Sequence, residues 1–223
     1  MKHRPLFVFF LLLLFSAPTF AGDSTRYFLV FLNPYPNLKM VDDSTYMVIQ
    51  KKHLEDMTRL QQSGFLVAAG PFEGGGGVFI VRAHSQTEVS DSMKTDISVS
   101  ANRVIPEIYP MNFYRGKLCE GNGDDMRSYE ALRLNNIRFG QKDCSPDRIK
   151  QEIDGWIANA EKQGKVIFVC TLGGEVPESV LIVADIPEKK RVATKHYQPK
   201  EPTAFIAILK NFFIAHGTFC ETE

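Results

Sequence analysis

The chain has 223 residues, with 26 basic and 26 acidic side chains, so its formal net charge at pH 7 is zero. Without excess positive charge it has no electrostatic means of holding nucleic acid or an anionic membrane surface, and we exclude both as partners. The length allows one large domain or two of ordinary size.

The first 21 residues have the pattern of a secretory signal peptide. Lys2 and Arg4 form a basic start, residues 6–15 are apolar, and Thr19 and Ala21 are small residues where a signal peptidase cleaves. An uncleaved membrane anchor is the alternative, but the apolar stretch is short for a hydrocarbon core of about 30 Å. We expect cleavage near Ala21 and a periplasmic or secreted protein. Loss of Lys2 and Arg4 would leave 24 basic and 26 acidic side chains, a formal charge of −2.

The next segment predicts a strand followed by a long helix. Residues 26–32 are rich in β-branched and aromatic side chains and end before Asn33 and Pro34, which indicates the first strand. Asp42, Asp43 and Ser44 offer N-cap acceptors for a helix that continues to Gln62 and ends before Gly64. Its residues at helical spacing are Met47, Gln50, Leu54, Met57 and Leu60.

Residues 65–69 and 78–83 predict two further strands, joined by a segment with glycines at 74–77. A phosphate-binding loop is the alternative for these glycines, but such a loop leads into a helix and ends in Lys-Ser or Lys-Thr. We therefore predict a hairpin connection. Ser85 and Glu88 form a capping box for a short helix that ends near residue 94.

Residues 104–115 predict the last strand of this unit, and Pro106 and Pro110 favour an irregular or edge position for it. The resulting order, β-α-β-β-α-β, is that of a ferredoxin-like unit.

The remainder of the chain predicts the same order again. Residues 129–137 indicate a strand, and Ser145 caps a helix with Pro146 at its first position. Strands at 166–172 and 180–185, a weak helix candidate at 187–195 and a strand within 203–215 follow. The predicted buried stripe of the second long helix consists of Ile149, Ile153, Trp156, Ile157 and Ala160.

The two halves also align in sequence, residues 60–67 with 160–167 and residues 112–119 with 211–220. A spacing of about 100 residues is too long for a solenoid repeat and favours a duplicated domain. We assign residues 26–118 to a first α+β unit, 119–127 to a linker and 128–223 to a second unit.

Each sheet needs cover for its inner face, which the other half can supply. We therefore predict an α+β fold in which two ferredoxin-like units pack as an intramolecular pseudo-dimeric α+β barrel. Such an internal pair predicts a monomer.

Four cysteines follow the leader: Cys119, Cys144, Cys170 and Cys220. An even number in an exported protein favours disulfide bonds, and three pairings are possible. Zinc is the competing interpretation, but no C-x-x-C pair or matching histidine spacing supports a metal site. Cys170 lies within an apparent strand, where an inert buried thiol is the alternative.

One histidine stands in a pattern that points to a family. His53 lies in the first long helix, Gly64 ends that helix, Gly70 and Pro71 close the second strand, and Asp96 follows the second helix. Over about residues 26–115 this pattern resembles the YCII-related family of small α+β domains. The resemblance implies the dimeric α+β barrel fold and, as in several members, a hydrolase or lyase activity through a His and Asp pair.

Carried over to this chain, the resemblance makes His53 the general acid or base and Asp96 its acidic partner. The family usually continues after that Asp with Pro and then Gly, where this chain has Ile97 and Asn102. Glu73 is a second candidate carboxylate.

A histidine can exchange a proton near neutral pH, and a carboxylate can fix its tautomer. The structural alternative for His53 is a half-buried ring bonded to a backbone carbonyl. In the second unit Ile153 stands before Gly164 as His53 stands before Gly64, so we expect a site in the first half alone.

No nucleophile elbow or flavin, haem or nicotinamide motif is present, so the sequence predicts no cofactor and no metal. Two functions stay open. The first is a small-molecule enzyme that uses His53 with Asp96 or Glu73; the second is a non-catalytic ligand-binding or structural protein of the periplasm. An open pocket at His53 would favour the enzyme, and a ring sealed under aromatic side chains would favour the other function.

Overall fold

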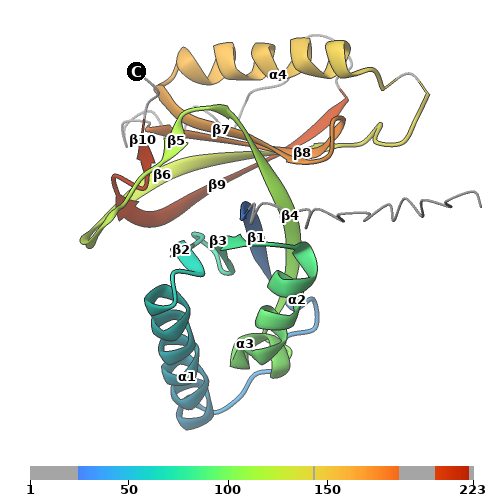
Figure 1. Ribbon diagram of the computed structural model, residues 1–223. Helices are drawn as coiled ribbons and strands as arrows, with labels where there is room; N and C mark the ends of the chain where they lie inside the picture. Colours follow the sequence, from blue (N-terminus) through green and yellow to red (C-terminus); the bar gives the residue numbers. More distant parts are fainter. Residues whose placement is uncertain (1–24, 143, 186–203, 221–223) are drawn as a thin grey trace, which may run out of the picture.

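The computed structural model describes residues 25–142, 144–185 and 204–220 (Figure 1). The first half contains β1 (Arg26–Pro34), α1 (Asp43–Gln62), β2 (Leu66–Pro71), β3 (Gly77–Ala83), α2 (Gln86–Thr95), α3 (Ile97–Ser100) and β4 (Val104–Arg115). The second half contains β5 (Lys117–Leu118), β6 (Asn122–Asn136), α4 (Pro146–Glu161), β7 (Lys165–Gly173), β8 (Pro177–Asp185), β9 (Phe205–His216) and β10 (Phe219–Cys220). The predicted α+β class is confirmed.

Eight of these strands form one antiparallel sheet in the order β2-β3-β1-β4-β7-β8-β6-β9. Within it, β2-β3-β1-β4 and β7-β8-β6-β9 show the same order when the strands are counted from β1 in the first half and from β6 in the second. The predicted strands are all present in the described residues, and β6 begins at Asn122, inside the segment assigned as a linker. The weak helix candidate at 187–195 and the leader lie outside the described residues.

Local signals explain where the helices begin. The side chain of Asp42 accepts a hydrogen bond from the Thr45 amide, Ser85 accepts one from Glu88, and Ser145 accepts one from Arg148. These contacts satisfy amides that have no partner within the helix. The glycines at 74–76 have positive φ angles and form the β2–β3 connection, so the hairpin prediction is confirmed.

The two outer strands of the sheet, β2 and β9, meet and close it. Phe72 and Phe212 form an antiparallel bridge, and the Glu73 amide donates to the Asn211 carbonyl over 2.8 Å. At Gly70 a Cβ atom would lie 1.8 Å from the backbone oxygen of Phe213, so only glycine allows this approach. We call these contacts the β2–β9 seam.

Strand β4 joins the two halves of the sheet. Its residues 104–110 pair with β1, and its residues from Met111 onward pair with β7. The predicted irregular or edge position is therefore confirmed for residues 104–110, which pair on one side only, although β4 as a whole lies between β1 and β7. Pro106 and Pro110 are tolerated there because the part of the strand that contains them pairs only with β1.

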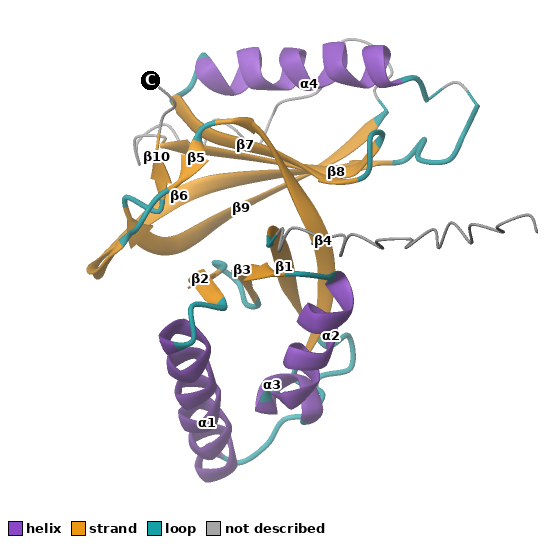
Figure 2. Ribbon diagram, viewed as in Figure 1, coloured by secondary structure: helices purple, strands orange, loops and turns teal. Residues whose placement is uncertain are grey.

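Three hydrophobic clusters fill the layers. One lies inside the curved sheet and includes Phe31, Phe168 and Phe212. A second lies between α4 and its sheet, and a third lies under α1 and α2. Figures 1 and 2 show α4 covering one side of the molecule and α1 to α3 covering the other.

The apolar stripe predicted for α1 is only partly buried. Met47 and Leu54 are 65% and 57% exposed, whereas Leu60 is buried as expected. The face toward the sheet also carries Ile49 and His53. Apolar residues occur on several sides of this helix, so spacing alone does not identify the buried face.

Disulfide bonding is confirmed for one pair, Cys119 and Cys220, which lie where β5 and β10 form a short ladder. Cys144 and Cys170 are free thiols. Burial raises the pKa of the Cys170 thiol, which matches the inert thiol that the sequence allowed.

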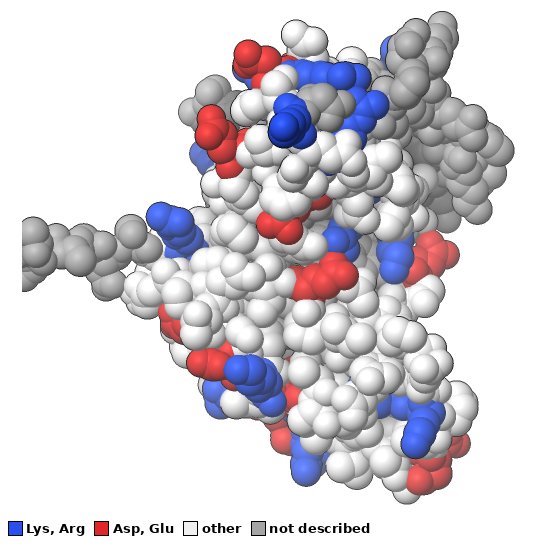
Figure 3. All heavy atoms as spheres, turned by 90° about the vertical axis from the view of Figure 1, so that its right-hand side faces the viewer, with Lys and Arg blue, Asp and Glu red and all other residues white. Residues whose placement is uncertain are grey.

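Basic and acidic side chains are interspersed on the face shown in Figure 3, and neither sign forms a continuous area there. Among the described residues, no helix has both the length and the apolar character needed to cross a membrane.

Candidate functional site

The candidate site lies where α1 packs against the outer side of strands β1, β2 and β3. The Asp42 N-cap fixes where α1 begins, and Ile49 and Leu60 are the buried side chains on the face of α1 that contacts the sheet. His53 lies one turn after Ile49 on this face, because residues four apart share a side of a helix. Asp96 stands at the junction of α2 and α3 and is the N-cap of α3.

The structure brings His53 and Asp96 together. His53 Nδ1 lies 2.8 Å from Asp96 Oδ2, and the second oxygen, Oδ1, accepts a 2.7 Å hydrogen bond from the Ser98 amide. The side chains of His53 and Asp96 are 16% and 3% exposed. We call this pair the His53–Asp96 dyad.

The dyad favours the charged form of the aspartate. Burial alone would raise the pKa of Asp96, but the hydrogen bond and charge of His53, together with the bonds from Ser98, hold it below its ordinary value. A carboxylate kept ionised in this way accepts the Nδ1 proton of the imidazole. That tautomer leaves Nε2 able to accept a proton.

The imidazole ring also lies on an aromatic surface. It is nearly parallel to the ring of Phe79, with 5.9 Å between the centroids and 10° between the planes. Phe79 belongs to the cluster under α1, whereas its neighbours Val78 and Ile80 belong to the cluster inside the sheet. The dyad therefore lies on the outer side of the sheet.

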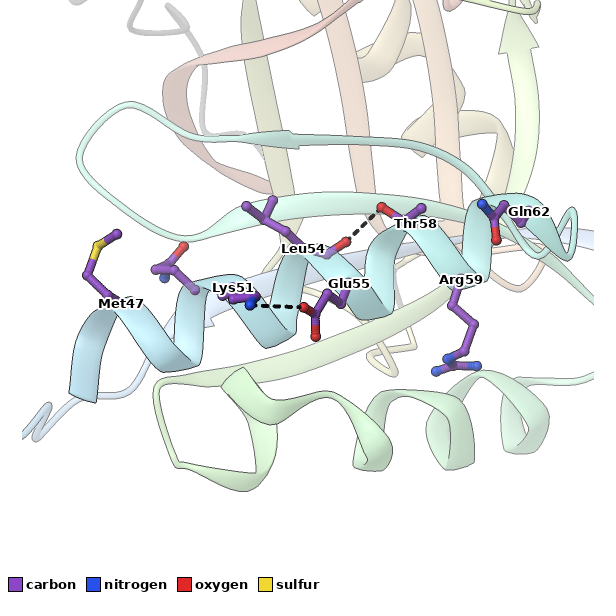
Figure 4. A pocket seen from close by; sticks show the side chains of 8 residues that line it. Met47, Lys51, Leu54, Glu55, Thr58, Arg59 and Gln62 are labelled. Atoms are coloured by element: carbon purple, nitrogen blue, oxygen red, sulfur yellow. Dashed lines mark hydrogen bonds and ion pairs between the residues drawn. The ribbon is translucent and has the colours of Figure 1, made fainter. Parts of the chain in front are cut away.

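An open, shallow hollow runs along the surface of α1 and is lined by residues of this helix alone. It has a volume of about 610 Å³, and Figure 4 shows side chains that line it on the surface of the helix, with the Lys51–Glu55 and Thr58–Leu54 contacts dashed. His53 is not one of its lining residues. The lining residues are Met47, Gln50, Lys51, Leu54, Glu55, Thr58, Arg59 and Gln62.

The other predicted positions lie elsewhere. Glu73 Oε2 accepts a 2.7 Å hydrogen bond from Asn211 Nδ2 at the β2–β9 seam, and the structure does not bring Glu73 to His53. Ile153 is 2% exposed in the cluster under α4. A second His–Asp pair, His216 Nδ1 to Asp125 Oδ2 at 2.9 Å, is solvent-exposed.

Sequence reasoning missed two parts of the site. Ser98 contributes through its backbone amide, which no residue type signals. Phe79 belongs to an apolar run in β3, and both faces of this strand are buried. The sequence therefore has no apolar–polar alternation that would show which face Phe79 is on. Within residues 25–142, 144–185 and 204–220, no three His, Cys, Asp or Glu side chains converge as a metal site requires.

No family model matches the chain, and no curated protein matches it. Among solved structures, it is similar to a candidate monooxygenase from Lactobacillus acidophilus NCFM, with 9% identity, a TM-score of 0.44, and coverage of 90% of this chain and 100% of that chain. An anthrone oxidase-like protein shares 10% identity, with a TM-score of 0.48 and coverage of 88% and 93%. A candidate monooxygenase from Fusobacterium nucleatum shares 9% identity, with a TM-score of 0.42 and coverage of 90% and 96%. Likenesses this distant assign no chemistry to the chain.

Proposed function

We propose that this protein is an exported small-molecule enzyme of the hydrolase or lyase type. His53 acts in it as the general acid or base, and Asp96 positions the imidazole. The observation that carries the proposal is the 2.8 Å contact between His53 Nδ1 and Asp96 Oδ2.

The chemistry of the dyad suits proton transfer. Asp96 fixes the tautomer through Nδ1 and stabilises the imidazolium that forms when Nε2 takes a proton from a substrate or from water. The same group can then return that proton to a leaving group. The His53 side chain keeps 16% of its surface exposed, so solvent reaches part of it.

Two further proposals belong with this function. The resemblance of the first half to the YCII-related family and the repeated strand order support an origin by duplication, with two ferredoxin-like units forming the barrel that relatives build by dimerising. The disulfide between Cys119 and Cys220 supports export to an oxidising compartment after cleavage near Ala21.

The second candidate function is non-catalytic. The observation that favours it is the stacking of His53 on Phe79, because a ring held between a carboxylate and an aromatic face can serve to fasten α1 to the sheet. The cluster inside the sheet is also rich in aromatic side chains that fill its centre. A binding or structural protein would keep the dyad for stability alone.

The two functions predict different behaviour of matched variants. The experiment screens the mature protein against lactones, carboxylic esters and hydroxy acids, with His53→Ala, Asp96→Asn and His216→Ala as variants. His216→Ala is the control, since it removes a histidine that is also paired with an aspartate but is exposed.

An enzyme should show a turnover that falls about 100-fold or more in His53→Ala and is kept in His216→Ala, because general acid–base catalysis contributes on that scale. Asp96→Asn should lower kcat and alter the pH profile of the reaction. Absence of turnover in the wild type, or equal turnover in His53→Ala, contradicts the proposal and favours the structural role.

A further inference from the structure

The interior of the curved sheet changes character toward one end. Alternate residues of a strand face the same side, so the residues that follow the interior cluster along each strand also point inward. Most of the cluster is apolar, but three of these next positions are polar or charged. They are Asn33 after Phe31 in β1, Arg133 after Ala131 in β6, and Lys210 before Phe212 in β9.

Arg133 is held in a defined orientation. Its guanidinium lies 3.9 Å from the centroid of the Phe31 ring and 5.6 Å from that of Tyr109. Nη2 donates to Glu107 over 2.7 Å and to the Tyr109 hydroxyl over 3.3 Å, and Nε donates to Ser179 over 3.4 Å. Its side chain is only 15% exposed.

One end of this guanidinium is left without an acceptor. Among the described residues none accepts a hydrogen bond from Arg133 Nη1, although no buried polar side-chain atom of the described chain lacks a partner. Nη1 is therefore open to solvent or to a ligand. A guanidinium that is stacked and already bonded on one side presents its remaining N–H groups at little entropic cost.

Lys210 adds a second positive charge to the same cavity. Its ammonium lies 5.1 Å from the centroid of the Phe72 ring. Arg133 and Lys210 together line a cavity of about 80 Å³, with Phe31, Phe72 and Leu181 among its apolar walls. Glu107 pairs with Arg133 and Glu178 lies close enough to influence Tyr109, whereas no described carboxylate forms an ion pair with Lys210.

We propose that this cavity binds the carboxylate of a small monocarboxylic acid whose body is aromatic or aliphatic. The carboxylate accepts hydrogen bonds from Arg133 Nη1 and from the Lys210 ammonium, and the first carbons of the body lie against Phe31 and Phe72. One water molecule needs a cavity of roughly 10–15 Å³. A cavity of about 80 Å³ therefore has room for the carboxylate and a few carbon atoms. Hydrogen bonds between charged groups, as here, are stronger than hydrogen bonds between neutral groups.

This site is separate from the dyad. Phe79, on which His53 stacks, faces the outer side of the sheet, whereas Phe31 belongs to the cluster inside it. The carboxylate site is therefore a ligand site independent of the proposed proton-transfer chemistry, and it stands or falls by a binding measurement.

The test compares benzoate and hexanoate with the uncharged benzamide and hexanamide by calorimetry and by amide chemical shifts of the mature protein. Benzoate should bind at least about tenfold more tightly than benzamide, with the largest shifts at Phe31, Arg133 and Lys210. Arg133→Met should weaken benzoate binding at least about tenfold, and Lys210→Met should weaken it several-fold.

Arg127→Met is the matched control, because Arg127 lies on the same strand and pairs with Asp185 over 3.6 Å but does not line the cavity. This variant and His53→Ala should bind benzoate as the wild type does. If Arg133→Met does not fold, Lys210→Met at a half-buried position still decides the matter.

Three results overturn the proposal: no carboxylate binds at about 10 mM, benzamide binds as well as benzoate, or wild-type affinity persists in both cavity variants. Loss of benzoate binding in His53→Ala would place the ligand at the dyad and would also overturn it.

Discussion

The two long helices occupy corresponding places in the two halves but are held by different forces. Helix α4 buries five side chains against its sheet: Ile149, Ile153, Trp156, Ile157 and Ala160. Helix α1 is longer, yet it buries only Ile49 and Leu60, and it contacts α3 through the polar His53–Asp96 dyad. Apolar packing therefore holds the helix of the second half in place, whereas a charged hydrogen bond contributes to holding the helix of the first half.

The two halves therefore place different groups under equivalent helices, apolar side chains in the second half and a titratable pair in the first. Ile153 fills the place under α4 that corresponds, in its spacing to the following glycine, to His53 under α1. An apolar side chain there adds packing but cannot exchange a proton. A helix that depends less on packing leaves room for a titratable pair at its inner face.

The largest expected effect is in the second half. Trp156→Ala should lower the free energy of unfolding by about 3–5 kcal/mol, because it removes a large buried side chain and leaves a cavity. The control in the first half is Leu54→Ala, which should change it by about 0.5 kcal/mol or less, since Leu54 is 57% exposed. Denaturant unfolding measures both, and equal losses would contradict the contrast between the helices.

A smaller loss is expected when the ends of the two halves are released from each other. Cys119→Ser should destabilise the protein by about 2–5 kcal/mol, because the disulfide closes a loop with a sequence separation of 101. Thermal unfolding under non-reducing conditions measures the effect. Cys144→Ser, which removes a free thiol, is the control and should leave the melting temperature nearly unchanged.

The β2–β9 seam offers a test of whether the halves depend on each other. Gly70→Ala should cost about 1–3 kcal/mol, because the added Cβ meets the Phe213 carbonyl and the strands must move apart. Gly155→Ala is the control, since a Cβ there has no atom within 4 Å. Hydrogen exchange of the Glu73 amide should rise in Gly70→Ala, and unchanged protection would show that the contact is not tight.

The smallest effect concerns the dyad and depends on pH. Because the pKa of Asp96 is lowered in the folded protein, its contribution to stability is present above the ordinary value of 3.8 and is lost as the pH falls through the folded pKa. Asp96→Asn should therefore be less stable than the wild type by about 1–2 kcal/mol at pH 7. The difference should shrink below pH 3.8. A difference that is constant with pH would show that the charge of Asp96 does not matter.

Much of the fold follows from local sequence signals. The caps at Ser85 and Ser145 and the stripe of α4 were predicted, and Asp42 was one of three adjacent candidates for the cap of α1. Each of these signals depends on residues within one or two turns. The buried side of α1 was not predicted, because Tyr46, Met47 and Val48 place apolar groups on its solvent side. The pairing of β4 with β7 and the β2–β9 seam depend on contacts between distant segments, which no local pattern encodes.

The candidate site was predictable in the same uneven way. The pattern around His53 and Asp96 could be recognised, and the structure places the two side chains in contact. The cavity with Arg133 could not be found, because Arg133 lies between Leu132 and Leu134, and this apolar–polar alternation predicts a solvent-facing arginine. Likewise, four cysteines allow three pairings, and only the geometry selects Cys119 with Cys220.

Strand β4 has a mechanical consequence for ligand binding. It is 12 residues long, about 40 Å when extended, and its two ends belong to different halves of the sheet. Near its end Tyr114 donates a 2.6 Å hydrogen bond to Asp154 of α4. The β1 ladder ends at Pro110 and the β7 ladder begins at Met111, so β4 alone could bend there. Opening the halves would also have to break the β2–β9 seam, so we expect ligands to reach the dyad or the cavity through side-chain and loop movement and not through domain opening.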